Sequence, residues 1–192
     1  MAPGPYSSPS LLERVRTRDF TAWTRLVALY GPMVRHWCQG WGGNQEDAED
    51  VAQEVFVAIS ASMDSFKREG EGSFRAWVRG ITRNKTLEHF RRQQGRPVAQ
   101  GGSSALQAIH ALPDPISPEK EAEEAGRLYH RALDLIRCEF EERSWQAFWL
   151  TAVEGRETSL VGSELNMSPT AVRIAKSRVL ARLREEAGEL ID

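Results

Sequence analysis

Two short stretches of the chain concentrate basic side chains, and both have the composition to hold a polyanion. Residues 75–92 carry six basic side chains and one acid, Glu88, whereas residues 173–184 carry five basic side chains and no acid. Arginine and lysine hold phosphate groups by charge and by hydrogen bonding. The whole chain has a net charge of −2, so it is not a polycation that binds anions non-specifically. Two separate basic stretches on such a chain indicate a partner with spaced anionic sites.

The first basic stretch combines its cations with aromatic residues. Arg75, Arg79 and Arg83 recur every four residues and therefore share one side of the expected helix. Cations that hold a backbone, and aromatic rings on which bases stack, are what single-stranded nucleic acid requires. Core packing is the alternative use of the rings, more so for Trp77 than for Phe66, which falls in an expected loop. The other polar members of this candidate surface are Lys67, Arg68, Asn84, Lys85, Arg91 and Arg92.

The second basic stretch lies in a helix-turn-helix pattern. Residues 157–166 and 168–188 are expected to form two helices, and Ser168 followed by Pro169 is a strong signal for a helix start. One helix of such a motif enters the major groove of DNA, where its early residues reach base edges. An ordinary helical hairpin with a solvated charged face is the alternative. The expected core positions are Leu160, Val161, Leu165, Met167, Val172, Val179 and Leu183, and the expected DNA-facing positions are Ser168, Thr170, Ala171, Arg173, Ile174, Lys176, Ser177, Arg178 and Arg182.

A third cluster is acidic and begins a helix expected from Asn44 to Met63. Its carboxylates, which include Asp47 and Asp50, suit the positive end of a helix dipole. A solvated helix start explains these acids but not the Gln53-Glu54 pair that continues the same face. A protein docking surface is therefore the better functional interpretation.

Several classes of protein are excluded by what accompanies these clusters. The two cysteines, Cys38 and Cys138, form no Cys-x-x-Cys or Cys/His cluster, so neither a zinc site nor a disulfide scaffold is indicated, and both are expected to be buried thiols. The four histidines are scattered, and no nucleophile–base pairing or glycine-rich phosphate loop is present. The sequence predicts no enzyme, no metal and no cofactor.

The composition indicates a folded chain that is not inserted in a membrane. Of its 192 residues, 41% are hydrophobic and 27% are charged, which is enough apolar material for a core. No window approaches about 18 consecutive apolar residues, and no secretory signal is visible. We therefore expect a soluble, cytoplasmic protein.

The elements that must position the three clusters are all predicted to be helices. Apolar residues recur at three and four positions and do not alternate, so the predicted class is all-α. Phe20, Trp23 and Tyr30 are expected on one helix face that ends at Gly31-Pro32, with a separate helix from Met33 to Gly40. Further helices are expected at 73–94, 118–139 and 142–153. The chain is divided into a lead-in at 1–19, a helical domain at 20–94, a flexible Gly/Pro-rich linker at 95–124 and a helix-turn-helix domain at 125–192.

Three motifs in this order resemble those of bacterial extracytoplasmic-function (ECF) sigma factors, the compact two-domain branch of the sigma-70 family. They are DAEDVAQEVF at 47–56, FRAWVRGITRN at 74–84 and SRVLARLREE at 177–186. The resemblance implies that Asp47, Asp50, Gln53 and Glu54 bind the largest subunit of core RNA polymerase. It implies that the 64–73 loop and the 74–92 helix capture and open the promoter −10 element, and that the last helix reads the −35 element. An anti-sigma factor is a further partner that the resemblance allows for.

Four residues depart from the family pattern without breaking it. Asn166 stands where glycine is usual in the turn, although Asn tolerates a left-handed backbone, and Gly80 interrupts the −10 helix. Ile174 and Ala175 replace more polar residues in the recognition helix. The alternative function is a stand-alone helix-turn-helix regulator of transcription, which would not need the acidic motif at 47–56.

Overall fold

The computed structural model describes residues 10–66, 74–93 and 118–191, and within these ranges the regular secondary structure is entirely helical. The predicted all-α class is thereby confirmed. Lys67, Arg68 and most of the predicted linker lie outside the described residues. None of the helices in the described ranges is long and apolar enough to span a membrane.

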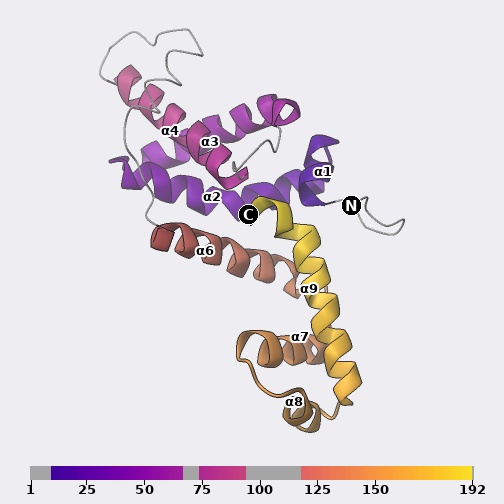
Figure 1. The fold of residues 1–192 in the computed structure, drawn as a ribbon. Coiled ribbons are helices and arrows are strands. Elements are labelled where there is room, and N and C mark those ends of the chain that lie inside the picture. The colour runs from indigo at the N-terminus through magenta and orange to yellow at the C-terminus, as the bar shows by residue number, and fades with distance from the viewer. Residues whose placement is uncertain (1–9, 67–73, 94–117, 192) are drawn as a thin grey trace.

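Helices α1 (Leu11–Arg16), α2 (Phe20–Gly40), α3 (Gln45–Ser62) and α4 (Phe74–Gln93) form one body at the top of Figure 1. A short 3₁₀ turn at Met63–Ser65 follows α3. Apolar side chains from all four helices meet in one core, which includes Leu12, Leu26, Val34, Val51, Val55, Ile59 and Val78. The predicted starts and ends of α3 and α4 are confirmed to within about two residues.

Helix α2 runs without a break through Gly31 and Pro32, so the predicted division into two helices was wrong. Proline removes one backbone donor and costs about 3 kcal/mol in a helix interior. The helix nevertheless continues because it has buried side chains on both sides of Pro32: Tyr30 before it, and Val34 and Trp37 after it. Burying side chains of this size stabilises the continuous helix by more than the proline costs.

Residues 11–16, which lie in the predicted lead-in, form α1, and a Ser10–Glu13 capping box begins this helix. Two further expectations were wrong. Phe20, expected on the buried face of α2, is 82% exposed because it is the first residue of the helix. Leu160, expected in the core of the helix pair, is 60% exposed, since its neighbour Val161 takes the inward position.

The remainder of the described chain consists of α6 (Pro118–Arg137), α7 (Glu142–Phe148), α8 (Thr158–Leu165) and α9 (Pro169–Ile191). A π-helical turn at Trp149–Val153 continues α7. Helices α7 and α8 form a small lower body against the first turns of α9 (Figure 1). Residues 118–124, placed in the flexible linker, are helical as the first turns of α6, which agrees with the predicted helix at 118–139.

The turn between α8 and α9 is built from residues 166–168. Asn166 adopts the left-handed conformation, with φ 52° and ψ 46°, and Ser168 accepts a hydrogen bond from the backbone of Ala171. Gly162 is buried beneath this turn, where an added Cβ would lie 2.7 Å from the carbonyl oxygen of Met167. The turn therefore fixes the direction in which α9 leaves α8.

Helices α6 and α9 connect the two bodies. In Figure 1, α9 rises from α7 and α8 to the upper helices, where the C-terminus lies. Near its C-terminal end, Ala187 and Leu190 are buried in the same core as α1 to α4, together with Leu128 and Ala132 of α6. The two halves of the chain therefore share apolar packing in this conformation.

Candidate nucleic-acid and protein interfaces

Asp47 is buried at the junction of α3 and α4 rather than displayed for a partner. It forms a capping box with Asn44, and its Oδ1 accepts hydrogen bonds from His89 Nε2 at 2.8 Å and Gln93 Nε2 at 2.7 Å. The bond from His89, then the backbone N–H of Asn44 and the amide of Gln93, hold the pKa of this carboxyl below its usual range. In this structure Asp47 fastens the end of α4 to the start of α3.

The other three predicted polymerase-binding residues lie at the surface. Asp50 and Gln53 are exposed on α3, and Glu54 beside them is half-buried and ion-paired with Arg92 of α4. Together with His89 and Gln93 they line a shallow hollow of about 460 Å³. A helical partner could approach this row of carboxylate and amide groups without displacing a core residue.

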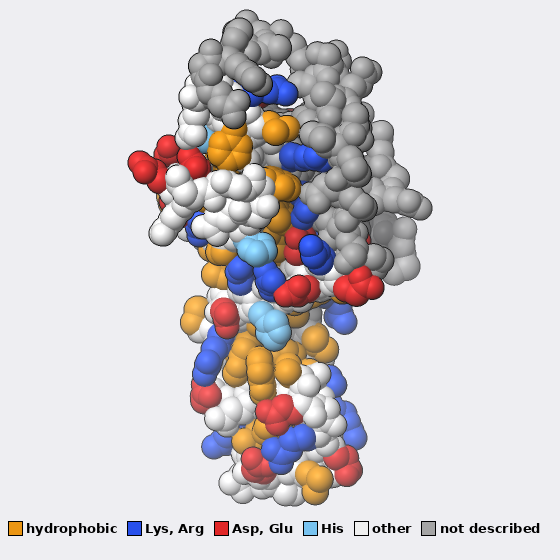
Figure 2. All heavy atoms as spheres, turned by 90° about the vertical axis from the view of Figure 1, so that its left-hand side faces the viewer, with side chains coloured by type: hydrophobic (Ala, Val, Ile, Leu, Met, Phe, Trp, Pro, Cys, Tyr) orange, Lys and Arg blue, Asp and Glu red, His pale blue; other side chains and the backbone are white. Residues whose placement is uncertain are grey.

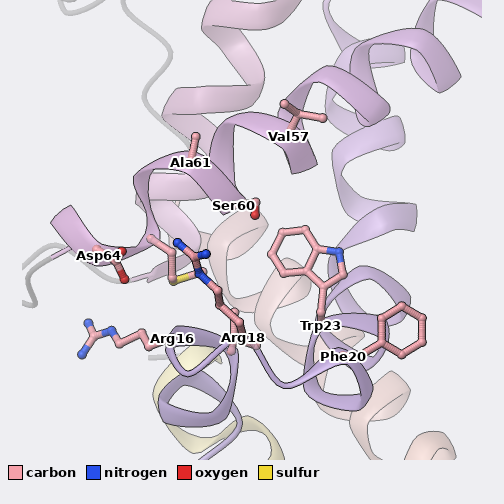
Figure 3. Close-up of a pocket in the computed structure, with 10 residues that line it drawn as sticks. Arg16, Arg18, Phe20, Trp23, Val57, Ser60, Ala61 and Asp64 are labelled. Atoms are coloured by element: carbon pink, nitrogen blue, oxygen red, sulfur yellow. The ribbon is translucent and has the colours of Figure 1, made fainter.

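An apolar groove at the other end of α3 was not foreseen from the sequence. It has a volume of about 580 Å³, and Figure 3 shows the rings of Phe20 and Trp23 on one side and Arg18 on the other, with Val57 on α3 near its edge. Val57 is 71% exposed and lies seven residues after Asp50, on the same side of the helix. The exposed face of α3 therefore begins with polar groups and ends at an apolar groove.

The aromatic residues near the start of α4 pack on one another. Phe66 lies 5.2 Å from Phe74 and 4.9 Å from Trp77, measured between ring centroids. Phe66 is buried, as is Phe74, and Trp77 is half-buried. In this conformation the three rings pack at one end of the core. Core packing was the alternative role that the sequence left open for them.

The basic side chains of α4 divide between two environments. Arg75 and Arg79, both predicted to hold the −10 strand, are directed at α6, where they pair with Glu121 at 3.1 Å and Glu124 at 2.9 Å. Arg83 is half-buried, and the Oδ1 atom of Asn84 is buried with no hydrogen-bond partner among the described residues. Towards the end of the helix, Lys85 pairs with Glu88, Arg92 pairs with Glu54, and Arg91 is exposed.

Most of the predicted −35 residues are exposed on the first turns of α9. They are Ser168, Thr170, Arg173, Ile174, Ser177 and Arg178, with Ala171 half-buried beside them. Lys176 donates to the carbonyl oxygen of Thr151 at 3.3 Å, which turns it toward the π-helical turn. Arg182 pairs with Glu139 and Glu186 at 2.6 and 2.8 Å and thus lies at the seam between the bodies.

The described ranges contain no cluster of three or more His, Cys, Asp or Glu that could hold a metal ion. Cys38 is buried, and burial raises the pKa of its thiol. Cys138 is exposed, so the expectation that both thiols are buried was wrong. It directly follows the last residue of α6 and belongs to none of the apolar clusters among the described residues.

Comparison with known proteins adds an independent observation to this geometry. Residues 26–96 match the sigma-70 region 2 family. The matched range contains most of α2 together with α3 and α4, and hence the acidic row and the basic helix described above.

Curated relatives extend the similarity to most of the chain. The chain is 28% identical to the ECF RNA polymerase sigma factor ShbA of Streptomyces griseus, over 91% of this chain and 92% of ShbA. It is 27% identical to the ECF RNA polymerase sigma factor SigE of Mycolicibacterium smegmatis, over 85% of this chain but 61% of SigE. It is 30% identical to RfaY of Xanthomonas campestris, a probable RNA polymerase sigma factor, over 76% of this chain and 35% of RfaY.

Two of the three motifs that carry the resemblance, at 47–56 and 74–84, lie within the region 2 match. The chain spans about three fifths of the length of SigE and about a third of that of RfaY, but nearly the whole of ShbA. The region 2 match and the similarity to ShbA together cover both bodies of the structure. The chain is therefore similar to ECF sigma factors over both bodies, and its residues 26–96 match region 2 of the sigma-70 family.

Proposed function

We propose that this chain directs bacterial core RNA polymerase to specific promoters and begins the opening of the DNA there. It acts as an initiation factor rather than as an enzyme. The observation that carries the proposal is the exposed row of Asp50 and Gln53 on α3, within the region 2 match, in a chain whose α9 also presents a basic face. A stand-alone DNA-binding regulator needs the second surface but not the first.

Each surface has a role in this proposal. The α3 face from Asp50 to Glu54 binds polymerase, and the exposed Val57 extends it toward the apolar groove. Helix α4 and the segment before it hold the −10 strand, with Arg75, Arg79, Arg83 and Lys85 as phosphate ligands. Binding to the strand drives opening, because extruding a base costs a few kcal/mol that pocket and phosphate contacts must offset.

The exposed face of α9 reads the −35 element as a duplex. Arg173 and Arg178 are placed to reach phosphates or base edges, while Ser168 and Thr170 lie at the helix start, where base contacts are common. Ile174, 55% exposed on the same face, offers an apolar contact such as a thymine methyl group accepts.

Reconstituted transcription tests the proposal. Core polymerase with the chain should produce transcripts from discrete start sites on a library of bacterial genomic fragments, and core polymerase alone should not. The double variant Arg75→Ala/Arg79→Ala should bind polymerase but fail to open promoters. Binding of the chain to duplex DNA without any polymerase-dependent start site would instead establish the stand-alone regulator.

A further inference from the structure

Helix α6 lies against the surface of α4 that is proposed to hold the −10 strand. The side chains of Arg75 and Arg79 are only 9% and 18% exposed, and they pair with Glu121 and Glu124 of α6. The Nε1 atom of Trp37 donates a hydrogen bond of 2.7 Å to the same carboxylate oxygen of Glu124 that Arg79 contacts. Acidic and basic side chains lie side by side across the middle of the face in Figure 2.

The site that Glu124 occupies has the chemistry of a nucleic-acid contact. The guanidinium of Arg79 lies over the rings of Trp37 and Trp41, 5.3 and 5.5 Å from their centroids. An arginine backed by aromatic faces, with an indole N–H beside it, is suited to an anion next to a stacked base. The carboxylate of Glu124 stands where a phosphate would make the same two contacts.

The same carboxylate is incompletely satisfied. Its Oε2 atom is buried and has no hydrogen-bond partner among the described residues. A buried carboxylate oxygen without a donor opposes burial. The contact between α6 and α4 is therefore not optimised as a core contact would be, and a competing ligand can displace α6 from α4.

A second set of ion pairs involves Arg182 of α9, which belongs to the proposed −35 surface. Arg182 of α9 pairs with Glu139, which follows α6, and both Arg182 and Arg25 of α2 pair with Glu186. Arg25 also pairs with Glu139 at 2.7 Å, and the hydroxyl of Tyr30 donates to the carbonyl oxygen of Leu190. Arginines of both proposed DNA surfaces are thus engaged in ion pairs within the chain: Arg75 and Arg79 with α6, and Arg182 with Glu139 and Glu186.

We propose that helix α6 closes the chain when polymerase is absent. Glu121 and Glu124 of α6 then pair with Arg75 and Arg79 in place of the phosphates of the −10 strand, and these ion pairs break before the chain binds promoter DNA. The proposal rests on the assignment of Arg75 and Arg79 to the −10 strand. It adds Trp37 and Trp41 to that surface as stacking residues that α6 covers in the closed chain.

The test compares two double variants of the full chain that remove the same charge from the same helix. Glu121→Gln/Glu124→Gln keeps side-chain size and disrupts the seam, whereas Glu119→Gln/Glu123→Gln alters two exposed acids nearby. Binding of a fluorescein-labelled, mixed-sequence single-stranded DNA is measured by anisotropy. Small-angle scattering reports opening, and far-ultraviolet circular dichroism checks that each variant is folded. The affinity of both variants for core polymerase is measured in parallel.

The seam variant should bind the single strand about tenfold more tightly than the unaltered chain, the equivalent of about 1.4 kcal/mol, and its radius of gyration should rise. The control variant should match the unaltered chain in both. Equal DNA affinity and equal radius for the folded seam variant would overturn the closure while leaving promoter opening by Arg75 and Arg79 intact. If Arg75→Ala/Arg79→Ala opened promoters normally, the proposed −10 role would fail, and the closure would fall with it.

Discussion

At the scale of single residues, two positions set the path of the chain between α8 and α9. Asn166 takes a left-handed conformation that most side chains adopt at a cost, and its side chain tolerates it. Gly162 lets the carbonyl of Met167 approach the helix closely. The sequence indicated the first through the resemblance, because Asn166 stands where the family usually has glycine. It did not indicate the second, because the close approach depends on a carbonyl five residues away.

We expect Gly162→Ala to lower the free energy of unfolding by about 1–3 kcal/mol, since the new methyl group would have to displace backbone. Gly80→Ala is the matched control: nothing among the described residues lies within 4 Å of its added Cβ, and a helix-interior glycine costs about 1 kcal/mol relative to alanine. Urea unfolding followed by circular dichroism checks both. A Gly162→Ala protein as stable as the unaltered chain would show that the turn relaxes freely.

Asp47 gives the junction of α3 and α4 a pH dependence of defined sign. Its folded-state pKa is held below the ordinary 3.8, mainly by the bond from His89. Its stabilising effect is therefore present above that value and is lost as the pH falls through the lower folded pKa. Asp47→Asn should be less stable than the unaltered chain at about pH 6 and should approach it at about pH 3. Urea unfolding at both values checks this, and a gap that does not narrow in acid would contradict the assignment.

At the scale of elements, the start of a helix was predicted best where its capping residue directly precedes it in the sequence. Asn44 begins α3 and Ser168 precedes α9, and both starts were placed correctly. It failed at α2, where Gly31-Pro32 has the form of a helix end but lies within a buried helix. Periodicity predicted that Phe20 and Leu160 are buried, although both are exposed. It identifies the apolar face of a helix but does not show how far along the helix other elements cover that face.

The exposed face of α9 provides the prediction at this scale. Arg178→Ala should weaken binding of the polymerase complex to its promoter by about 5–150-fold, the equivalent of about 1–3 kcal/mol. Arg184→Ala, an equal loss of charge at an exposed position farther along α9, should change binding little. Fluorescence anisotropy with duplex promoter DNA measures both. Equal losses for the two variants would mean that α9 contributes general charge rather than a specific contact.

At the scale of the whole molecule, the two halves are joined by contacts that no local pattern reveals. Arg25 and Glu186 lie 161 positions apart, and Trp37 and Glu124 lie 87 apart. The sequence predicted the acidic and basic stretches separately but not their pairing, because ion pairs at such separation depend on how the bodies pack. Burial raises the pKa of Glu139, but the hydrogen bonds from Arg182 and Arg25 outweigh it and leave that pKa lowered.

Arg25→Ala should open the seam between the bodies. The buried Glu186 would keep only Arg182 as an ionic partner among the described residues, and Glu139 would lose one of its two arginines. The radius of gyration from small-angle scattering should increase, with helix content unchanged. Arg137→Ala, which removes an exposed arginine 3.7 Å from Glu142, should leave the radius unchanged. An Arg25→Ala protein as compact as the unaltered chain would show that apolar packing alone holds the halves together.

Polymerase binding by the exposed α3 face is tested most directly by stoichiometric co-elution of the chain with bacterial core RNA polymerase in gel filtration. Asp50→Arg/Gln53→Ala changes the exposed α3 row, and Asp134→Arg/Gln146→Ala makes the same chemical changes at exposed positions on α6 and α7. The unaltered chain and the second variant should co-elute with polymerase, and the first variant should not. Failure of the unaltered chain to bind polymerase, with binding to duplex DNA by itself, would contradict the account.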